Sequence, residues 1–393
     1  MNSNLLPDEK YSLIEGGLFR KAQMKFGVQN HQGLLALAGI CIAWIPLVLL
    51  TAIEGTLYSG PDMPFLHDVA MHARILVALP VLILIRSVID IKTTAVLKYM
   101  TLSLLDDEEQ RKMISVTLPR MRKLACSSLT EIILILLVVG SAFSLSQSGA
   151  YTELLGGSTS WKLVNTQDGG MISLAGKWAA FISVPFFQFL LLQWLWRYIV
   201  WIMLLYHFSK APLKLLSTHA DRSAGLGIII LAQRSFSAIF FAGSMVISGQ
   251  LIVLIMNSPD DFLLIQRVVI GYIILSLLLL LLPLLFFIGK LVRTKQKGLL
   301  HLSKLGTEMS RTFEKDWLTD IPFEKRIEDR QVDPSMAYDY SSMYDVLQQL
   351  RVVPVTVRDI VSLVVSIAIP FLPILFVYFS AAEVLQKIIG FLL

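Results

Sequence analysis

The sequence predicts an all-α, polytopic membrane protein with seven transmembrane helices. Two observations predict this class. Of the 393 residues, 55% are hydrophobic and only 16% are charged, whereas soluble domains carry about 25% charged residues. In addition, seven separate runs approach the roughly 20 apolar residues that a helix needs to cross a bilayer. The two cysteines, Cys41 and Cys126, lie in or beside these runs and are expected to be buried thiols rather than a disulfide.

The predicted spans follow in chain order, and the second is the weakest because it is short and contains Arg86. The fourth and fifth spans are longer than a bilayer requires, so we expect them to tilt or to project beyond the membrane. The seven spans cover residues 33–53, 75–91, 124–146, 178–206, 228–256, 268–289 and 359–380.

The distribution of basic residues predicts the orientation. With the N-terminus inside, the inner segments hold 26 Lys and Arg, the outer segments hold 5, and 3 lie within spans. Because Lys and Arg collect in cytoplasmic loops, we expect the N-terminus inside and the C-terminus outside. If the second span did not cross, the topology downstream would invert.

This topology divides the chain into four parts. A cytoplasmic N-terminal segment (1–32) precedes a six-span bundle (33–289), a cytoplasmic helical segment (290–358), and the seventh span with a short outer tail (359–393). Within 290–358, an apolar stripe from Leu302 to Trp317 predicts one helix, 318–340 an irregular linker, and 341–352 a second short helix. The stripe fits packing against the membrane face or a contact in an oligomer.

The first group of polar candidates is His67, Asp68 and His72, with Arg74 close behind. On a helix, Asp68 and His72 share one face. The favoured interpretation is structural, with Asp68 capping or pairing locally. The alternatives are a sensor of outside pH and a metal site with His67, Asp68 and His72 as ligands.

The second group is the polar loop, residues 217–227, which joins the two longest spans. It contains His219, Asp221, Arg222 and Gly225. We expect a turn that starts the fifth span, with Asp221 as helix cap or first-turn acid and the glycines allowing close approach. The alternative is a ligand-gated or charge-coupled switch. The loop lacks the G-x-G-x-x-G pattern of a phosphate-binding loop.

Charges within the spans form the third group. Ionisable side chains at membrane depth usually face protein or water, and Glu131 is the natural partner for the arginines. An Arg–Glu131 pair that holds the bundle together is favoured over a conduction site. The candidates for pathway or coupling roles in this group are Arg86, Glu131, Arg197 and Arg234.

The seventh span supplies the fourth group. Ser362 and Ser366 are four residues apart, and Pro370 and Pro373 follow. Proline breaks the helical hydrogen-bond ladder, so this span is predicted to be interrupted. The favoured interpretation is a kinked packing helix, and the alternative is that the serines and freed carbonyls line a pore.

Three stretches resemble a group of uncharacterised bacterial inner-membrane proteins. They are D-x-x-x-H-x-R-x-L-x-x-L-P at 68–80, PFFQFLLLQWLWR at 185–197 and THADRSAGLG at 218–227. The third differs from the T-H-P-D-[KR]-x-G-G-L pattern of the group at Ala220 and Ala224. The resemblance implies the bacterial inner membrane and no particular activity. It marks Asp68, His72, Arg74, His219, Asp221, Arg222 and Gly225 as motif residues.

Enzyme signatures such as H-E-x-x-H, G-x-S-x-G and the Walker loop are absent from the sequence. We therefore expect no catalytic residues, no cofactor and no nucleic-acid partner. The leading hypothesis is a homo-oligomeric channel or transporter for ions or small solutes, with the seventh span near the pathway. The alternative is a membrane sensor or accessory protein that signals to a cytoplasmic partner through 290–358.

Overall fold

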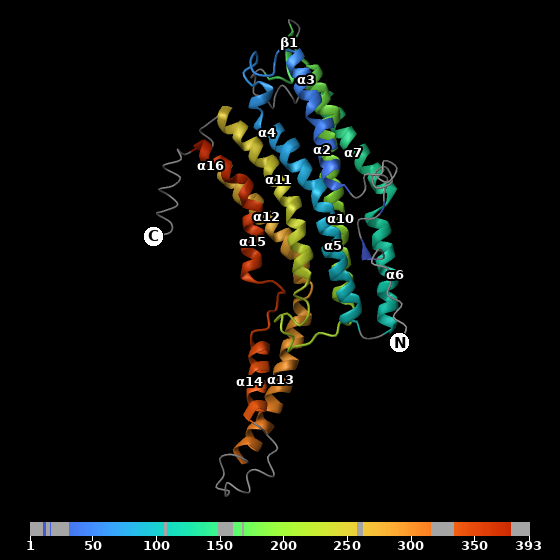
Figure 1. The fold of residues 1–393 in the computed structure, drawn as a ribbon, viewed down its shortest axis with the longest axis vertical. Helices are drawn as coiled ribbons and strands as arrows, with labels where there is room; N and C mark the ends of the chain where they lie inside the picture. Colours follow the sequence, from blue (N-terminus) through green and yellow to red (C-terminus); the bar gives the residue numbers. More distant parts are fainter. Residues whose placement is uncertain are drawn as a thin grey trace.

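The computed structural model describes residues 11–12, 16, 31–105, 108–147, 160–166, 169–257, 262–315 and 334–378. The described residues form an elongated helical bundle (Figure 1). Most of the predicted segment 1–32, Trp317, residues 318–333 and the outer tail beyond residue 378 lie outside the described residues.

Within the described residues, six helices or runs of consecutive helices are long and apolar enough to cross a membrane, over 32–53, 116–144, 174–210, 229–256, 263–285 and 357–378. They coincide with six of the seven predicted spans. In chain order they are built by α2 (Gln32–Ala43) with α3 (Ile45–Ile53), α6 (Glu108–Ala125) with α7 (Ser128–Gln147), α9 (Leu174–Trp178) with η4 (Ala179–Ser183) and α10 (Val184–Lys210), α11 (Ile229–Asn257), α12 (Phe262–Leu285), and α15 (Val357–Ala368) with η7 (Ile369–Phe371) and α16 (Leu372–Tyr378).

The predicted second span is helical but does not meet this criterion. It lies in a longer helical run made of α4 (Val69–His72), η3 (Ala73–Ala78) and α5 (Leu79–Ser103). This run passes along the bundle beside α2 and α11 (Figure 1). Its hydropathy is low because it contains charged residues, among them Arg86, Asp90 and Lys92. Charged side chains at membrane depth usually face protein or water.

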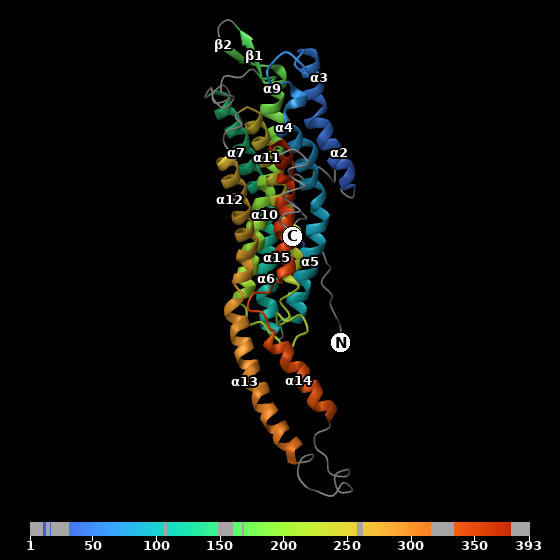
Figure 2. The ribbon, with the colours of Figure 1, turned by 90° about the vertical axis from the view of Figure 1, so that its left-hand side faces the viewer.

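One end of the bundle, which we call the hairpin end, carries a feature that the all-α prediction missed. Strands β1 (Leu163–Thr166) and β2 (Gly169–Ile172) pair in an antiparallel hairpin beside α9 (Figure 2). The bridge from Met63 to Ser160 joins the preceding residues to the α3–α4 connection. The opposite end, the loop end, carries the polar loop.

Beyond the loop end, two antiparallel helices project from the bundle (Figures 1 and 2). They are α13 (Ile288–Phe313) and α14 (Pro334–Gln348). They pack so closely that a Cβ at Gly306 would overlap Tyr340. The Tyr340 hydroxyl donates to the Leu302 carbonyl at 2.8 Å. The predicted helical pair is therefore present, but α14 begins at Pro334, seven residues earlier than expected, because proline fits the first turn of a helix.

The core follows the axis of the bundle. Three tryptophans, Trp161, Trp194 and Trp201, are fully buried, and α11 is the central helix that packs against α4, α5 and α15. Helices α7 and α12 expose many large apolar side chains. Such faces are expected of helices whose outer surface contacts lipid.

Candidate functional site

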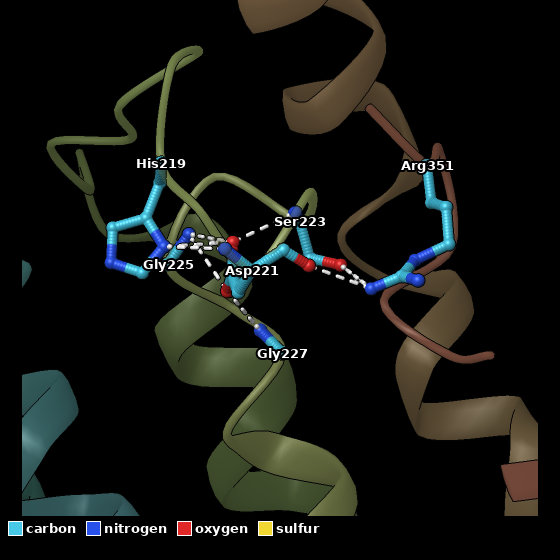
Figure 3. A network of polar contacts seen from close by, with 6 residues as sticks. All are labelled: His219, Asp221, Ser223, Gly225, Gly227 and Arg351. Atoms are coloured by element: carbon cyan, nitrogen blue, oxygen red, sulfur yellow. Dashed lines mark hydrogen bonds and ion pairs between the residues drawn. The ribbon is translucent and has the colours of Figure 1, made fainter. Parts of the chain in front are cut away.

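The polar loop is held together by one carboxylate (Figure 3). The two oxygens of Asp221 accept backbone N–H bonds from Ser223 (2.8 Å), Gly225 (3.1 Å) and Gly227 (2.9 Å). Nδ1 of His219 lies 2.8 Å from Oδ1 of Asp221. Burial alone would raise the pKa of Asp221, but these hydrogen bonds outweigh it and lower the pKa.

The prediction that Asp221 caps the fifth span is wrong in detail. Helix α11 begins at Ile229, and the carboxylate binds the turns before it. Two non-glycine residues, Arg222 and Ala224, and one glycine, Gly225, have positive φ angles. The loop must fold tightly around the carboxylate, and a Cβ at Gly227 would lie 2.9 Å from Oδ2 of Asp221. The expected close approach at this glycine is thus confirmed.

A residue far along the chain completes the loop. The Arg351 guanidinium donates to the Asp221 carbonyl at 2.7 Å and to Oγ of Ser223 at 3.2 Å, and its backbone N–H donates to the Arg222 carbonyl at 2.8 Å. Figure 3 shows Arg351 reaching this loop from the segment that follows α14. The contacts attach the projecting helix pair to the start of α11.

A second polar group brings together three of the predicted pathway residues. Arg234 on α11 donates to Oγ of Ser362 on α15 at 2.9 Å, and the hydroxyls of Ser237 and Ser366 are 3.3 Å apart. These side chains border what we call the serine cleft, a space of about 300 Å³. Its lining residues are Lys92, Leu231, Arg234, Ser237, Ser362, Leu363 and Ser366.

The charge of the serine cleft is mainly positive. Lys92 and Arg234 line it, and one carboxylate, Asp359, lies 3.6 Å from the Arg234 guanidinium. Asp359 is fixed because it also forms a capping box with Thr356 at the start of α15. Two cations and three hydroxyl groups, offset by one carboxylate, are the surroundings in which a small anion is stabilised.

The prolines of the seventh span do not line this cleft. The predicted interruption is present, as the 3₁₀ turn η7, but Pro370 is buried against neighbouring side chains and Pro373 is exposed. The break therefore separates α15, which borders the serine cleft, from α16, which packs near the hairpin end of α11.

The other intramembrane charges form a separate buried group. Arg86, Glu131 and Arg197 are each less than 10% exposed, and Gln193 donates to Oε1 of Glu131 at 2.8 Å. A space of about 10 Å³ lies beside Arg86, Gln193 and Arg197, and it holds about one water molecule. The Gln193–Glu131 hydrogen bond joins α10 to α7, and the predicted Arg–Glu131 pair stays a prediction.

The first predicted group lies at the hairpin end, and its members separate. Asp68 is buried and caps α4 by accepting the Met71 N–H at 2.9 Å; it also accepts from the Trp161 indole at 3.0 Å. Lys162 lies 2.9 Å from its Oδ2. Burial alone would raise the pKa of Asp68, but the neighbouring Lys162 and these hydrogen bonds lower it.

The two histidines of this group have different surroundings. His67 is exposed, whereas His72 packs between the rings of Trp44 and Phe65. Among the described residues, no three His, Cys, Asp or Glu side chains are grouped so that they could hold a metal ion. The structure therefore supports the capping interpretation of Asp68 and gives no support to a metal site at His67, Asp68 and His72.

Sequence reasoning missed several residues that complete these groups. Asp359 carried a detectable signal, because T-V-R-D at 356–359 has the spacing of a capping box. Gln193, Trp161 and Arg351 carried none, since their partners lie 62 or more residues away in the chain.

The fold and these groups define a helical, multi-pass membrane protein with polar groups at both ends of its bundle. Comparisons with protein-family models, with curated proteins and with solved structures found no match.

Proposed function

We propose that the chain is a homo-oligomeric channel or transporter of the bacterial inner membrane that passes small anions, with the serine cleft on the pathway. The observation that carries this proposal is that Lys92 and Arg234 line one cleft together with the hydroxyls of Ser237, Ser362 and Ser366, and that Arg234 donates to Ser362. Anion pathways are lined by arginine and lysine. The seventh predicted span supplies one wall of this cleft.

The proposal uses the predicted topology of seven spans, with the N-terminus inside and the C-terminus outside. Helix α5 has 25 residues, or about 37 Å at 1.5 Å per residue, which is long enough to act as the second span. With it included, the serine cleft lies toward the cytoplasm. Large apolar side chains exposed on the projecting pair, such as Leu300 and Tyr338, support contacts between subunits there.

The test is efflux of chloride and phosphate from liposomes that contain the purified protein, with potassium efflux as the comparison. We expect anion efflux that falls about tenfold in Arg234→Gln, which corresponds to about 1.4 kcal/mol of lost stabilisation. Arg358→Gln is the matched control, because this arginine is exposed near the start of the same helix, α15. Absence of anion efflux, or equal loss in both variants, would refute the proposal.

One observation favours a second function, that of a membrane sensor or accessory protein acting through 290–358. Arg351 attaches the α13–α14 pair to the loop that precedes α11, so a partner bound to this pair would act directly on α11. If anion efflux is absent and a cytoplasmic protein co-purifies with wild type but not with Arg351→Ala, this second function replaces the first.

A further inference from the structure

The serine cleft lies close to the loop end of the bundle. Arg234 is the sixth residue of α11, and Ser362 is the sixth residue of α15, so each lies about 7.5 Å along its helix from the first residue. The 29 residues of α11 correspond to about 43 Å, which matches the full thickness of a bilayer with its polar regions, about 40–45 Å. For a helix that spans the bilayer, this depth is the boundary between lipid headgroups and hydrocarbon.

The cleft offers hydrogen-bond donors that are spread over several ångströms. The Arg234 guanidinium donates to Oγ of Ser362 at 2.9 Å and lies 3.6 Å from Asp359, and an arginine has further N–H donors beyond these two contacts. The Lys92 ammonium has no ion-pair partner within the part of the chain that the structure describes. Ser362 and Ser366 lie about 6 Å apart along α15. A phosphate group, which has several acceptor oxygens, matches such spread donors better than an anion of one atom does.

The charges that surround the cleft select among phosphate groups. Lys92 and Arg234 line it, and Asp359 is the carboxylate beside them, which leaves one net positive charge. A phosphodiester carries one negative charge, whereas a phosphate monoester carries about 1.5–2 at neutral pH. The charge of the cleft therefore matches a phosphodiester.

Exposed apolar side chains continue from the cleft toward the hairpin end. On α5, Leu84 and Val88 precede Lys92 at intervals of four residues, so the three share one face of the helix. On α15, Ile369 follows Ser366 by three residues. Leu84, Val88 and Ile369 are each exposed. Helices α5 and α15 lie on opposite sides of α11 (Figure 1), so apolar surface flanks the cleft on both sides in the direction of the membrane centre.

We propose that the serine cleft binds an anionic glycerophospholipid. Its phosphodiester lies between Lys92 and Arg234, and its acyl chains lie along the exposed apolar faces of α5 and α15. Basic pockets between membrane helices hold lipid headgroups in this way. The apolar surface beside the cleft assigns the phosphate group to a lipid rather than to free phosphate. The binding does not rest on the transport proposed above, although a bound lipid and a passing anion would compete for the same two cations.

The test is native mass spectrometry of the purified, delipidated full chain, titrated with dioleoyl phosphatidylglycerol. Dioleoylglycerol has the same chains without the phosphate, and dioleoyl phosphatidylcholine has the phosphodiester with a compensating cation. Glycerol 3-phosphate and inorganic phosphate have the phosphate without the chains. We expect one saturable phosphatidylglycerol per chain, phosphatidylcholine and dioleoylglycerol at least about tenfold weaker, and no binding of the two free phosphates at the same concentrations.

Variants locate the lipid. Lys92→Gln should weaken phosphatidylglycerol binding about tenfold, and Lys92→Arg should retain it because the charge is kept. Ser366→Leu, which places an apolar side chain in the cleft, should weaken binding by at least as much and is the second variant if Lys92→Gln fails to fold. Arg358→Gln is the matched control, since it removes an exposed cation of α15 outside the cleft lining. Folding of each variant is checked by a monodisperse elution profile and an unchanged melting temperature.

The proposal is overturned if phosphatidylcholine, dioleoylglycerol or free phosphate binds as tightly as phosphatidylglycerol. It is also overturned if a folded Lys92→Gln or Ser366→Leu variant binds phosphatidylglycerol as the Arg358→Gln control does. Anion efflux without selective lipid binding would remove this inference and leave the proposed function in place. Selective lipid binding without anion efflux would do the reverse.

Discussion

Replacement of Asp221 by alanine should destabilise the protein by several kcal/mol, because this carboxylate organises the polar loop. It accepts backbone N–H bonds from Ser223, Gly225 and Gly227. Hydrogen bonds to a charged group contribute about 1.5–3 kcal/mol each, which sets an upper limit of about 4.5–9 kcal/mol. The Asp221 side chain is 23% exposed, so water replaces part of this loss, and we expect about 3 kcal/mol.

The assay is thermal unfolding of the purified protein in detergent, followed by tryptophan fluorescence, with hydrogen exchange of residues 217–228 as a local probe. A loss of about 3 kcal/mol should lower the melting temperature by about 5 °C or more. Asp345→Ala, which removes an exposed carboxylate from α14, is the control. The reasoning is refuted if Asp221→Ala melts with the wild type and its loop exchanges no faster.

The pH dependence of the folding stability follows from the direction in which the pKa of Asp221 is shifted. The pKa of Asp221 is lowered in the folded protein, since its hydrogen bonds outweigh the effect of burial. The ionised carboxylate therefore stabilises the fold fully above the ordinary Asp value near 3.9, and this stabilisation is lost as pH falls through the lowered pKa. The difference in stability between wild type and Asp221→Ala should be constant from neutral pH to about pH 5 and should shrink in stronger acid.

Three further predictions concern single residues. Ala224→Gly should raise the melting temperature, because Ala224 has a φ of 56° and a left-handed conformation costs a non-glycine residue about 1–2 kcal/mol; an unchanged or lower melting temperature would show that the buried methyl group matters more. Arg351→Ala should speed hydrogen exchange in the polar loop and leave exchange at the hairpin end unchanged, and uniform acceleration would contradict a local role. Asp68→Asn should lower thermal stability by about 3 kcal/mol, since it leaves the buried partner of Lys162 uncharged; stability equal to the wild type would contradict the capping and pairing assigned to it.

Much of the fold could be predicted, because a helix that crosses lipid must be apolar over its whole length. This rule locates the six candidate spans, with boundaries that differ from the observed ones by up to eight residues. The proline chemistry of the last span predicts the interruption found at η7. The second predicted span shows where the rule weakens. Helix α5 buries Arg86 and leaves Lys92 half-buried beside the serine cleft, and these charges lower its mean hydropathy, so hydropathy alone does not identify it.

The polar sites could be predicted only in part. Local sequence identified Arg234 and the serines of the last span, because polar residues are rare within membrane spans. It identified Asp68 and Asp221 because each stands shortly before an apolar run. It could not identify their partners. Trp161 is 93 residues from Asp68, and Arg351 is 130 residues from Asp221, and such pairings are set by how the helices pack.

The wrong prediction for Asp221 has a physical cause. An aspartate shortly before an apolar run fits a helix cap in sequence terms, but Asx-type turns use the same residue with the same local spacing. Here the carboxylate accepts from three backbone N–H groups of the loop, and the helix starts at Ile229. Ala224 has a positive φ of 56°, a backbone conformation that favours glycine.

Helix α11 borders the polar loop and two separate spaces of the described structure. The polar loop precedes its first residue, Arg234 borders the serine cleft near its start, and Gln250 and Leu254 line a cavity of about 530 Å³ near its end. Between these positions, α11 packs against α5 with Ala242 and Ser244 fully buried. The cleft and the cavity are therefore separate spaces with a packed segment of α11 between them. Under the function proposed above, passage of a solute from one end to the other would require α11 to move relative to α5 or α15. The Arg351 contacts join the projecting helix pair to the loop that precedes α11, which is where a partner of that pair would bias such a movement.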